Sequence, residues 1–164
     1  MMPLPRSSLV RTLVVLMYGV CPAFSEAAPY IVVGITDGDT IQLLSDEKRQ
    51  MICRVHGIDA PEKAQPFGQA SKASLSELVY RQTVDVQVAG APSYGRAVCR
   101  IKLRGVDVGR EQIVRGMAWM SRKYTKDQSY DAAEVNARAK QLGLWIDPKP
   151  IPPWNYRHHL KAVR

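Results

Sequence analysis

Residues 30–44 read YIVVGITDGDTIQLL, and this stretch predicts a β-hairpin. Its first six residues are β-branched or aromatic apart from one glycine, a composition typical of strands. Asp37-Gly38-Asp39 supplies turn-forming residues, and residues 40–44 return as the partner strand. The hairpin therefore carries two carboxylates in its turn.

Outward from this hairpin, further segments have the composition of short strands and helices. Strands are expected over residues 30–35, 40–44, 50–58, 83–89 and 96–103. Helices are expected over residues 68–81, 108–115 and 129–142. Three strands, a helix and two further strands match the order of a five-stranded OB-fold barrel. The predicted fold class is therefore a β-barrel with three helices, of the α+β type.

The helix expected over residues 68–81 has apolar residues at helical spacing. Its buried face is expected to contain Ala70, Ala73, Leu75, Leu78 and Val79.

The first 27 residues have the layout of a secretory signal peptide. Residues 13–20 are apolar and uncharged, and Ser25 and Ala27 place small residues at positions −3 and −1 of a cut. The apolar run is shorter than the roughly 20 residues of a membrane span. We expect cleavage after Ala27 and a secreted or periplasmic bacterial protein. Cleavage after Ser25 and an uncleaved signal anchor are the alternatives.

The chain is basic, with 23 Lys and Arg against 15 Asp and Glu and a net charge of +8. Loss of residues 1–27 would remove Arg6, Arg11 and Glu26 and leave a net charge of +7. Such a charge favours polyanionic partners, although solubility alone would also explain it. Together with the motifs below, it supports a nucleic-acid substrate.

Signal cleavage would also remove Cys21 and leave two cysteines, Cys53 and Cys99. An even count in an oxidising compartment suggests a disulfide. In a strand, odd offsets place side chains on opposite faces. If Arg54 and Arg96 face a site, both cysteines face away from it, on the same side. We therefore predict a Cys53–Cys99 bridge, and two buried free thiols are the alternative.

Six charged residues near turn formers lie between positions 37 and 96. They are Asp37, Asp39, Arg54, Asp59, Glu62 and Arg96. Carboxylates bind hard cations, and arginines bind phosphate. A site with both residue types is suited to metal-assisted cleavage of a phosphodiester. Asp37-Gly38-Asp39 alone is better explained as a plain hairpin turn, and the combined spacing favours the metal site.

Four motifs follow one another in the chain. They are Asp37-Gly38-Asp39-Thr40, the run RVHGIDAPE at residues 54–62, Tyr94-Gly95-Arg96 and Leu142-Gly143-Leu144-Trp145. With these motifs the chain resembles the staphylococcal nuclease (thermonuclease) family over about residues 30–147. The resemblance implies a nuclease of DNA and RNA that leaves 3′-phosphate products. We expect a monomer, and stacking of aromatic side chains on bases favours single strands.

The resemblance also implies a calcium site. Asp39 and Asp59 resemble the family's two calcium carboxylates, the carbonyl of Ala60 resembles its third protein ligand, and Asp37 resembles the carboxylate just outside this shell. Oxygen ligands of this kind select Ca²⁺, with Mg²⁺ or Mn²⁺ as rivals. The family has threonine at position 60, but only the carbonyl is needed.

For catalysis, the resemblance makes Glu62 the general base that activates water. Arg54 and Arg96 resemble the pair that binds the scissile phosphate, and Tyr94 and Tyr124 resemble residues that line the nucleotide pocket. A glutamate is a weak base at neutral pH, so the metal and both arginines must stabilise the charge that develops.

The chain also departs from the family pattern. The loop at residues 63–67 is shorter than in the family's best-known member, which leaves the positioning of Glu62 open. A frequent lysine before Tyr-Gly-Arg is Ser93, and a pocket tyrosine is replaced by Arg122. Arg122, with Lys123 and Lys126, forms a candidate basic track beside Tyr124.

The expected nuclease-like domain covers residues 28–147, and residues 148–164 form a proline-rich basic tail. We expect this tail to be extended, with Trp145 and Trp154 anchoring it to the domain. Two other functions compete with the nuclease. A non-catalytic OB-fold module of the envelope would bind nucleic acid without needing the full set of acidic and basic residues. A structural calcium-binding domain would not need the arginines.

Overall fold

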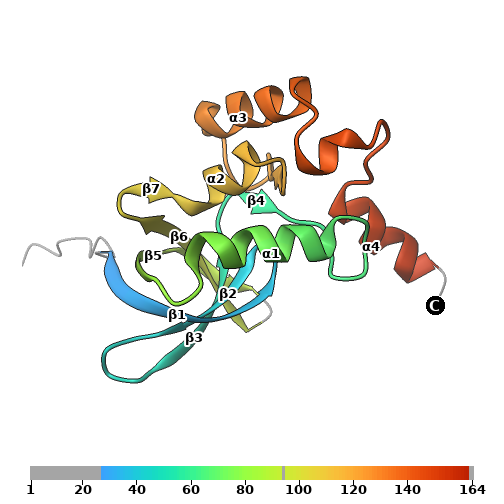
Figure 1. Ribbon diagram of the computed structural model, residues 1–164. Coiled ribbons are helices and arrows are strands. Elements are labelled where there is room, and N and C mark those ends of the chain that lie inside the picture. The colour runs from blue at the N-terminus through green and yellow to red at the C-terminus, as the bar shows by residue number, and fades with distance from the viewer. Residues whose placement is uncertain (1–26, 94, 163–164) are drawn as a thin grey trace, which may run out of the picture.

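The computed structural model describes residues 27–93 and 95–162 (Figure 1). Residues 1–26 of the expected signal segment at residues 1–27, with Cys21, and the expected pocket residue Tyr94 lie outside the described residues. Within the part that is described, none of the helices has the length and apolarity needed to cross a bilayer.

Five strands form a closed barrel, as the sequence predicts. They are β1 (Ala28–Asp37), β2 (Thr40–Leu44), β3 (Gln50–Val55), β5 (Thr83–Ser93) and β6 (Arg96–Leu103). The strand order is β3-β2-β1-β5-β6, with antiparallel neighbours. A parallel pairing of β3 with β6 closes the barrel.

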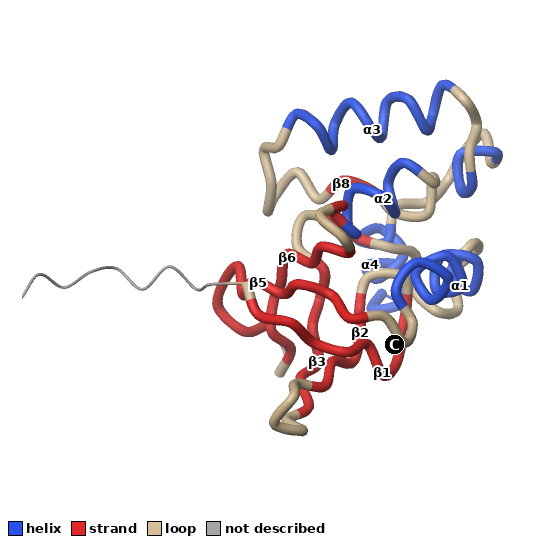
Figure 2. Tube along the Cα trace, turned by 60° about the vertical axis from the view of Figure 1, so that its left-hand side comes forward, coloured by secondary structure: helices blue, strands red, loops and turns tan. Residues whose placement is uncertain are grey.

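Shorter strands and the helices complete the fold. The strands are β4 (Ile58–Asp59), β7 (Val106–Asp107) and β8 (Trp119–Met120). The helices are α1 (Gly68–Val79), α2 (Val108–Val114), α3 (Gln128–Ala139), α4 (Pro153–Ala162) and a 3-10 turn, η1 (Gly143–Ile146). Figure 2 shows the barrel strands (red) grouped together, with the helices (blue) above them and to their right.

Cys53 and Cys99 form a disulfide in the structure, and both residues are fully buried in the main core. They lie on β3 and β6, the two strands whose parallel pairing closes the barrel. In a chain-entropy account, a bridge across 46 residues stabilises the native state by about 4 kcal/mol. The disulfide therefore reinforces the closure of the barrel.

The third strand ends earlier than the sequence predicts. β3 stops at Val55, and Gly57 adopts a φ of 81°, in the left-handed region that favours glycine. After this turn the chain resumes as β4, which pairs with β8 rather than with the barrel. The turn therefore redirects the chain and places Asp59 at one end of the barrel.

The buried face of α1 differs from the apolar face predicted for it. Ala70 and Ala73 are exposed, whereas Ser71 and Ser74 are buried. The hydroxyl of Ser71 donates to the carbonyl of Met117 at 2.6 Å, and Ser74 donates to Gln112 Oε1 at 2.7 Å. Because these hydroxyls have partners, small polar residues replace alanine in the contact with α2.

The C-terminal segment is not an extended tail but contains a fourth helix, α4, where three helices were predicted. The expected anchoring by tryptophan is present, since the ring of Trp154 lies edge-on to that of Trp119, with 6.5 Å between the ring centroids. Tyr156 also donates to the carbonyl of Ala64 at 3.3 Å. α4 therefore packs beside the loop that precedes α1 (Figure 1).

Gly38 lies between the two carboxylates of the hairpin turn, and a substitution there tests how closely the turn packs against α1 and Ala60. A methyl group at Gly38 would overlap the hydroxyl of Ser71 and lie 2.8 Å from the Cβ of Ala60. We expect Gly38→Ala to lower the free energy of unfolding by about 1–3 kcal/mol, measured by urea denaturation. The matched control is Gly90→Ala, since a methyl group there meets no atom within 4 Å. Equal stability of the two variants would contradict the close packing at Gly38.

Candidate active site

A pocket of about 970 Å³ opens at the end of the barrel where the β1–β2 turn meets β4. The described residues to which the family resemblance gave a role in catalysis, metal binding or the nucleotide pocket all line it. They are Asp37, Asp39, Arg54, Asp59, Ala60, Glu62, Arg96 and Tyr124. Segments far apart in the chain thus converge on one cavity.

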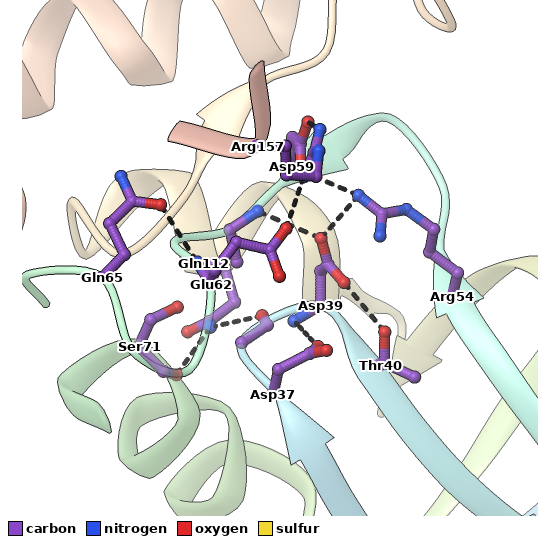
Figure 3. Close-up of polar contacts among 12 residues, drawn as sticks. Asp37, Asp39, Thr40, Arg54, Asp59, Glu62, Gln65, Ser71, Gln112 and Arg157 are labelled. Atoms are coloured by element: carbon purple, nitrogen blue, oxygen red, sulfur yellow. Dashed lines mark hydrogen bonds and ion pairs between the residues drawn. The ribbon is translucent and has the colours of Figure 1, made fainter. Parts of the chain in front are cut away.

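Arg54 on β3 links the two central carboxylates of the pocket (Figure 3). Its Nη2 lies 2.8 Å from Asp39 Oδ2 and 2.8 Å from Asp59 Oδ1. The register of β2 with β3 places Arg54 opposite Thr40, the neighbour of Asp39. Burial disfavours the guanidinium charge, but the two carboxylates outweigh it and raise the pKa of Arg54.

Asp39 is almost completely buried, with 2% of its surface exposed. The Thr40 hydroxyl donates to Oδ1 at 2.9 Å, and the backbone N–H of Ala60 donates to Oδ2 at 3.0 Å. Burial nevertheless raises the pKa of Asp39 to about 7, with the charge of Arg54 opposing that shift. Additional positive charge at this carboxylate would therefore be favourable.

The other carboxylate of the turn, Asp37, supports the backbone of Asp39. Its Oδ1 accepts a hydrogen bond from the N–H of Asp39 at 3.1 Å. Asp37 also lines the pocket. Asp37 therefore stabilises the backbone conformation of the turn that carries Asp39.

Gln112 on α2 holds this turn against α1 and was not identified from the sequence. Its side chain is fully buried and donates through Nε2 to the carbonyls of Gly38, at 3.0 Å, and Ser71, at 3.1 Å. Its Oε1 accepts from Ser74. One amide thus ties two helices to the carboxylate-bearing turn, and no sequence motif marks it.

Glu62 lies at the start of the short loop after β4, where Gln65 braces it. The backbone N–H of Glu62 donates to Gln65 Oε1 at 3.1 Å, and Gln65 Nε2 donates to the carbonyl of Ile151 at 2.5 Å. The C-terminal segment therefore supports the short loop that carries Glu62.

Arg157 on α4 also belongs to the site, although the sequence analysis did not include it. Its guanidinium contacts Glu62 Oε1 at 2.6 Å, Asp59 Oδ1 at 3.1 Å and Asp59 Oδ2 at 2.7 Å (Figure 3). Hydrogen bonds to Asp59 and Glu62 raise the pKa of Arg157. The available sequence signal was its position three residues after the anchoring Trp154.

The predicted basic track divides in the structure. Tyr124 is 65% exposed, lines the pocket and has Lys123 Nζ 5.3 Å from its ring centroid. Arg122 instead forms ion pairs with Asp131 at 2.5 Å and Glu134 at 3.4 Å. Lys123 and Tyr124 therefore face the cavity, whereas Arg122 holds α3.

Arg96 enters the pocket from the start of β6, opposite Ser93 in the β5–β6 pairing. Among the described residues, it has no carboxylate within ion-pair distance. Its charge is therefore available to an anion in the cavity.

The donors around Asp39 and Asp59 fit a hard cation. Over residues 27–93 and 95–162, no group of three or more His, Cys, Asp or Glu side chains is arranged to hold a metal. Asp39 and Asp59 nevertheless lie close enough to share one guanidinium nitrogen. A cation bound by this pair would complete its shell with backbone carbonyl oxygen, such as that of Ala60, and water, a mixture that Ca²⁺ and Mg²⁺ accept.

The chain is similar to known nucleases. The family model described as staphylococcal nuclease homologue matches residues 52–147. A Haemophilus influenzae protein named "Uncharacterized endonuclease" is 38% identical over 154 residues, which cover 93% of this chain and 86% of that protein. A Shigella flexneri protein named "Micrococcal nuclease" is 34% identical over 141 residues, covering 79% of this chain and 80% of that protein.

Gln112 offers a test of the scaffold that supports the site. In Gln112→Met, the carbonyls of Gly38 and Ser71 and the hydroxyl of Ser74 lose a buried partner. We expect the free energy of unfolding to fall by about 3 kcal/mol in urea denaturation, because unsatisfied buried polar groups are costly. Gln50→Met, at an exposed position, is the control and should unfold as the unaltered protein does. Equal stability of both variants would refute the scaffold role.

Proposed function

This chain belongs to the staphylococcal nuclease family, and from that premise we propose that it is a calcium-dependent nuclease of DNA and RNA. The observation that carries the proposal is the Arg54 bridge between Asp39 and Asp59, in a cavity that Glu62 and Arg96 also line. The cavity thus combines carboxylates for a cation with arginines for phosphate, the two requirements for phosphodiester cleavage.

The cation would be held by the carboxylates of Asp39 and Asp59 and the carbonyl of Ala60. When bound, it would neutralise charge on the phosphate and favour attack by water. Asp37 supports this ligand set from outside through the backbone of Asp39. Calcium is the proposed ion because the family resemblance implies it and these oxygen donors suit it, with Mg²⁺ and Mn²⁺ as rivals.

Glu62 is the proposed general base, taking a proton from the attacking water. Its side chain is 38% exposed, so water can reach the carboxylate. Arg54 and Arg96 bind the phosphate and stabilise the charge that develops during in-line displacement. The 5′-oxygen leaves, and the product carries a 3′-phosphate.

Tyr124 is proposed to stack on a base, and its large exposed ring suits an unpaired strand. Tyr94 is proposed to share this role. We further propose a monomer that is secreted or periplasmic after loss of the N-terminal segment. The Cys53–Cys99 disulfide supports an oxidising compartment.

Digestion assays on residues 28–164 test the reaction and its base together. Single-stranded and plasmid DNA should be cut in excess Ca²⁺ and left intact in excess chelator. Glu62→Gln should lower turnover by roughly 10²-fold, because it removes the general base. Glu77→Gln, at an exposed position of α1, should retain activity. DNA binding without cleavage in Ca²⁺, Mg²⁺ and Mn²⁺ would instead identify a non-catalytic binding module.

Lysine substitutions test the arginines separately from their charge. Arg54→Lys and Arg96→Lys should each reduce kcat/KM about 10-fold or more, since lysine lacks the planar fork of donors. Arg110→Lys on the exposed side of α2 is the matched control and should cut DNA normally. Normal kcat/KM in both site variants would remove the bidentate phosphate contact from the mechanism.

A further inference from the structure

The helix α4 is part of the pocket wall. Trp154 packs edge-on against Trp119, Tyr156 donates to the carbonyl of Ala64, and Pro153 is buried. The hydrogen bond from Gln65 to Ile151 fixes the segment just before the helix. These contacts hold α4 beside the loop that carries Glu62.

From this position α4 presents a basic face to the cavity. Arg157, His158 and Lys161 all line the pocket, together with Trp154. Lys123 lines it as well, from the segment after β8. Arg157 and Lys161 thus add positive charge from α4 to that of Arg54 and Arg96, which the barrel strands contribute.

Arg157 is paired with groups that have other roles in the proposed reaction. It contacts both oxygens of Asp59, a proposed metal ligand, and the carboxylate of Glu62, the proposed base. A divalent cation on Asp59 would repel the guanidinium at this short range. A cation on Asp59 would therefore displace Arg157 from that carboxylate.

The side chain of Arg157 has room to take another partner. It is 38% exposed at the pocket rim, whereas the side chain of Arg54 is 23% exposed. Release from Asp59 requires only a rotation of the Arg157 side chain, because α4 itself is held by other residues. A phosphate in the cavity is the anion that would replace the carboxylates.

We propose that Arg157 is a third phosphate-binding arginine, which the carboxylates of Asp59 and Glu62 hold until metal and nucleic acid enter the pocket. The proposal rests on the nuclease function above and extends it to the C-terminal helix. Its partner is a phosphate of the substrate backbone, bound by the planar fork of the guanidinium. His158 and Lys161 lie on the same face of α4 and would face the neighbouring part of the bound nucleic-acid strand.

Two binding measurements test this role without relying on cleavage. Calorimetric titration with Ca²⁺ alone should show tighter binding to Arg157→Ala, because a competing internal cation is gone. Fluorescence anisotropy with a cleavage-resistant phosphorothioate oligonucleotide in Ca²⁺ should show about 10-fold weaker binding or more. The salt dependence of that binding should fall by roughly 0.7 in log–log slope, the value for one phosphate on a single strand.

Control variants separate the contact from charge and folding. Lys140→Ala, at the exposed end of α3, removes one positive charge outside the pocket and should bind the oligonucleotide normally. Arg157→Lys keeps the charge and should recover only part of the affinity. Thermal unfolding of each variant checks that the fold is intact.

The outcomes distinguish this proposal from the nuclease function itself. Unchanged oligonucleotide binding by Arg157→Ala overturns the phosphate role, and unchanged Ca²⁺ affinity overturns the competition at Asp59. Either result leaves metal-dependent cleavage by the unaltered protein standing. Failure of the unaltered protein to cleave would reject the nuclease function, while the two binding measurements would still decide whether Arg157 contacts phosphate.

Discussion

The bridge from Arg54 to Asp39 and Asp59 is the interaction on which the site depends. Both carboxylates are largely buried, with exposures of 2% and 6%, and come from a hairpin turn and from β4. Buried like charges repel unless a cation neutralises them. The guanidinium on β3 satisfies both and thereby fixes the distance between two segments that share no strand pairing. The proposed cation site would thus use the same constraint that holds this end of the barrel together.

The helices stabilise this end of the barrel through polar contacts as well as apolar packing. Gln112 reaches the carbonyls of Gly38 and Ser71 in an interior where every unpaired group is costly. α1 and α2 therefore meet the hairpin turn with matched donors and acceptors. Such matching restricts the turn to one geometry, whereas apolar packing alone tolerates small shifts.

The sequence predicted the order of the barrel strands and the convergence of the charged motifs. Strand composition, and carboxylates beside turn-forming residues, can both be recognised in short stretches of sequence. The sequence did not predict the end of β3 at Val55, because the composition of residues 50–58 predicts one strand and the positive φ of Gly57 interrupts it. Apolar spacing also misjudged Ser71, whose burial depends on a distant carbonyl. Arg157 was missed because its partners are about a hundred residues earlier in the chain, and no local pattern encodes such a contact.

The position of the disulfide has a consequence for oxidative folding. Neither cysteine has accessible surface, and their strands are the pair that closes the barrel. An external oxidant must therefore reach the thiols before the barrel is complete, so that bond formation is coupled to the last stages of assembly. In the native protein, a reductant gains access only when β3 and β6 separate. The resistance of the disulfide to reduction therefore depends on how rarely β3 and β6 separate.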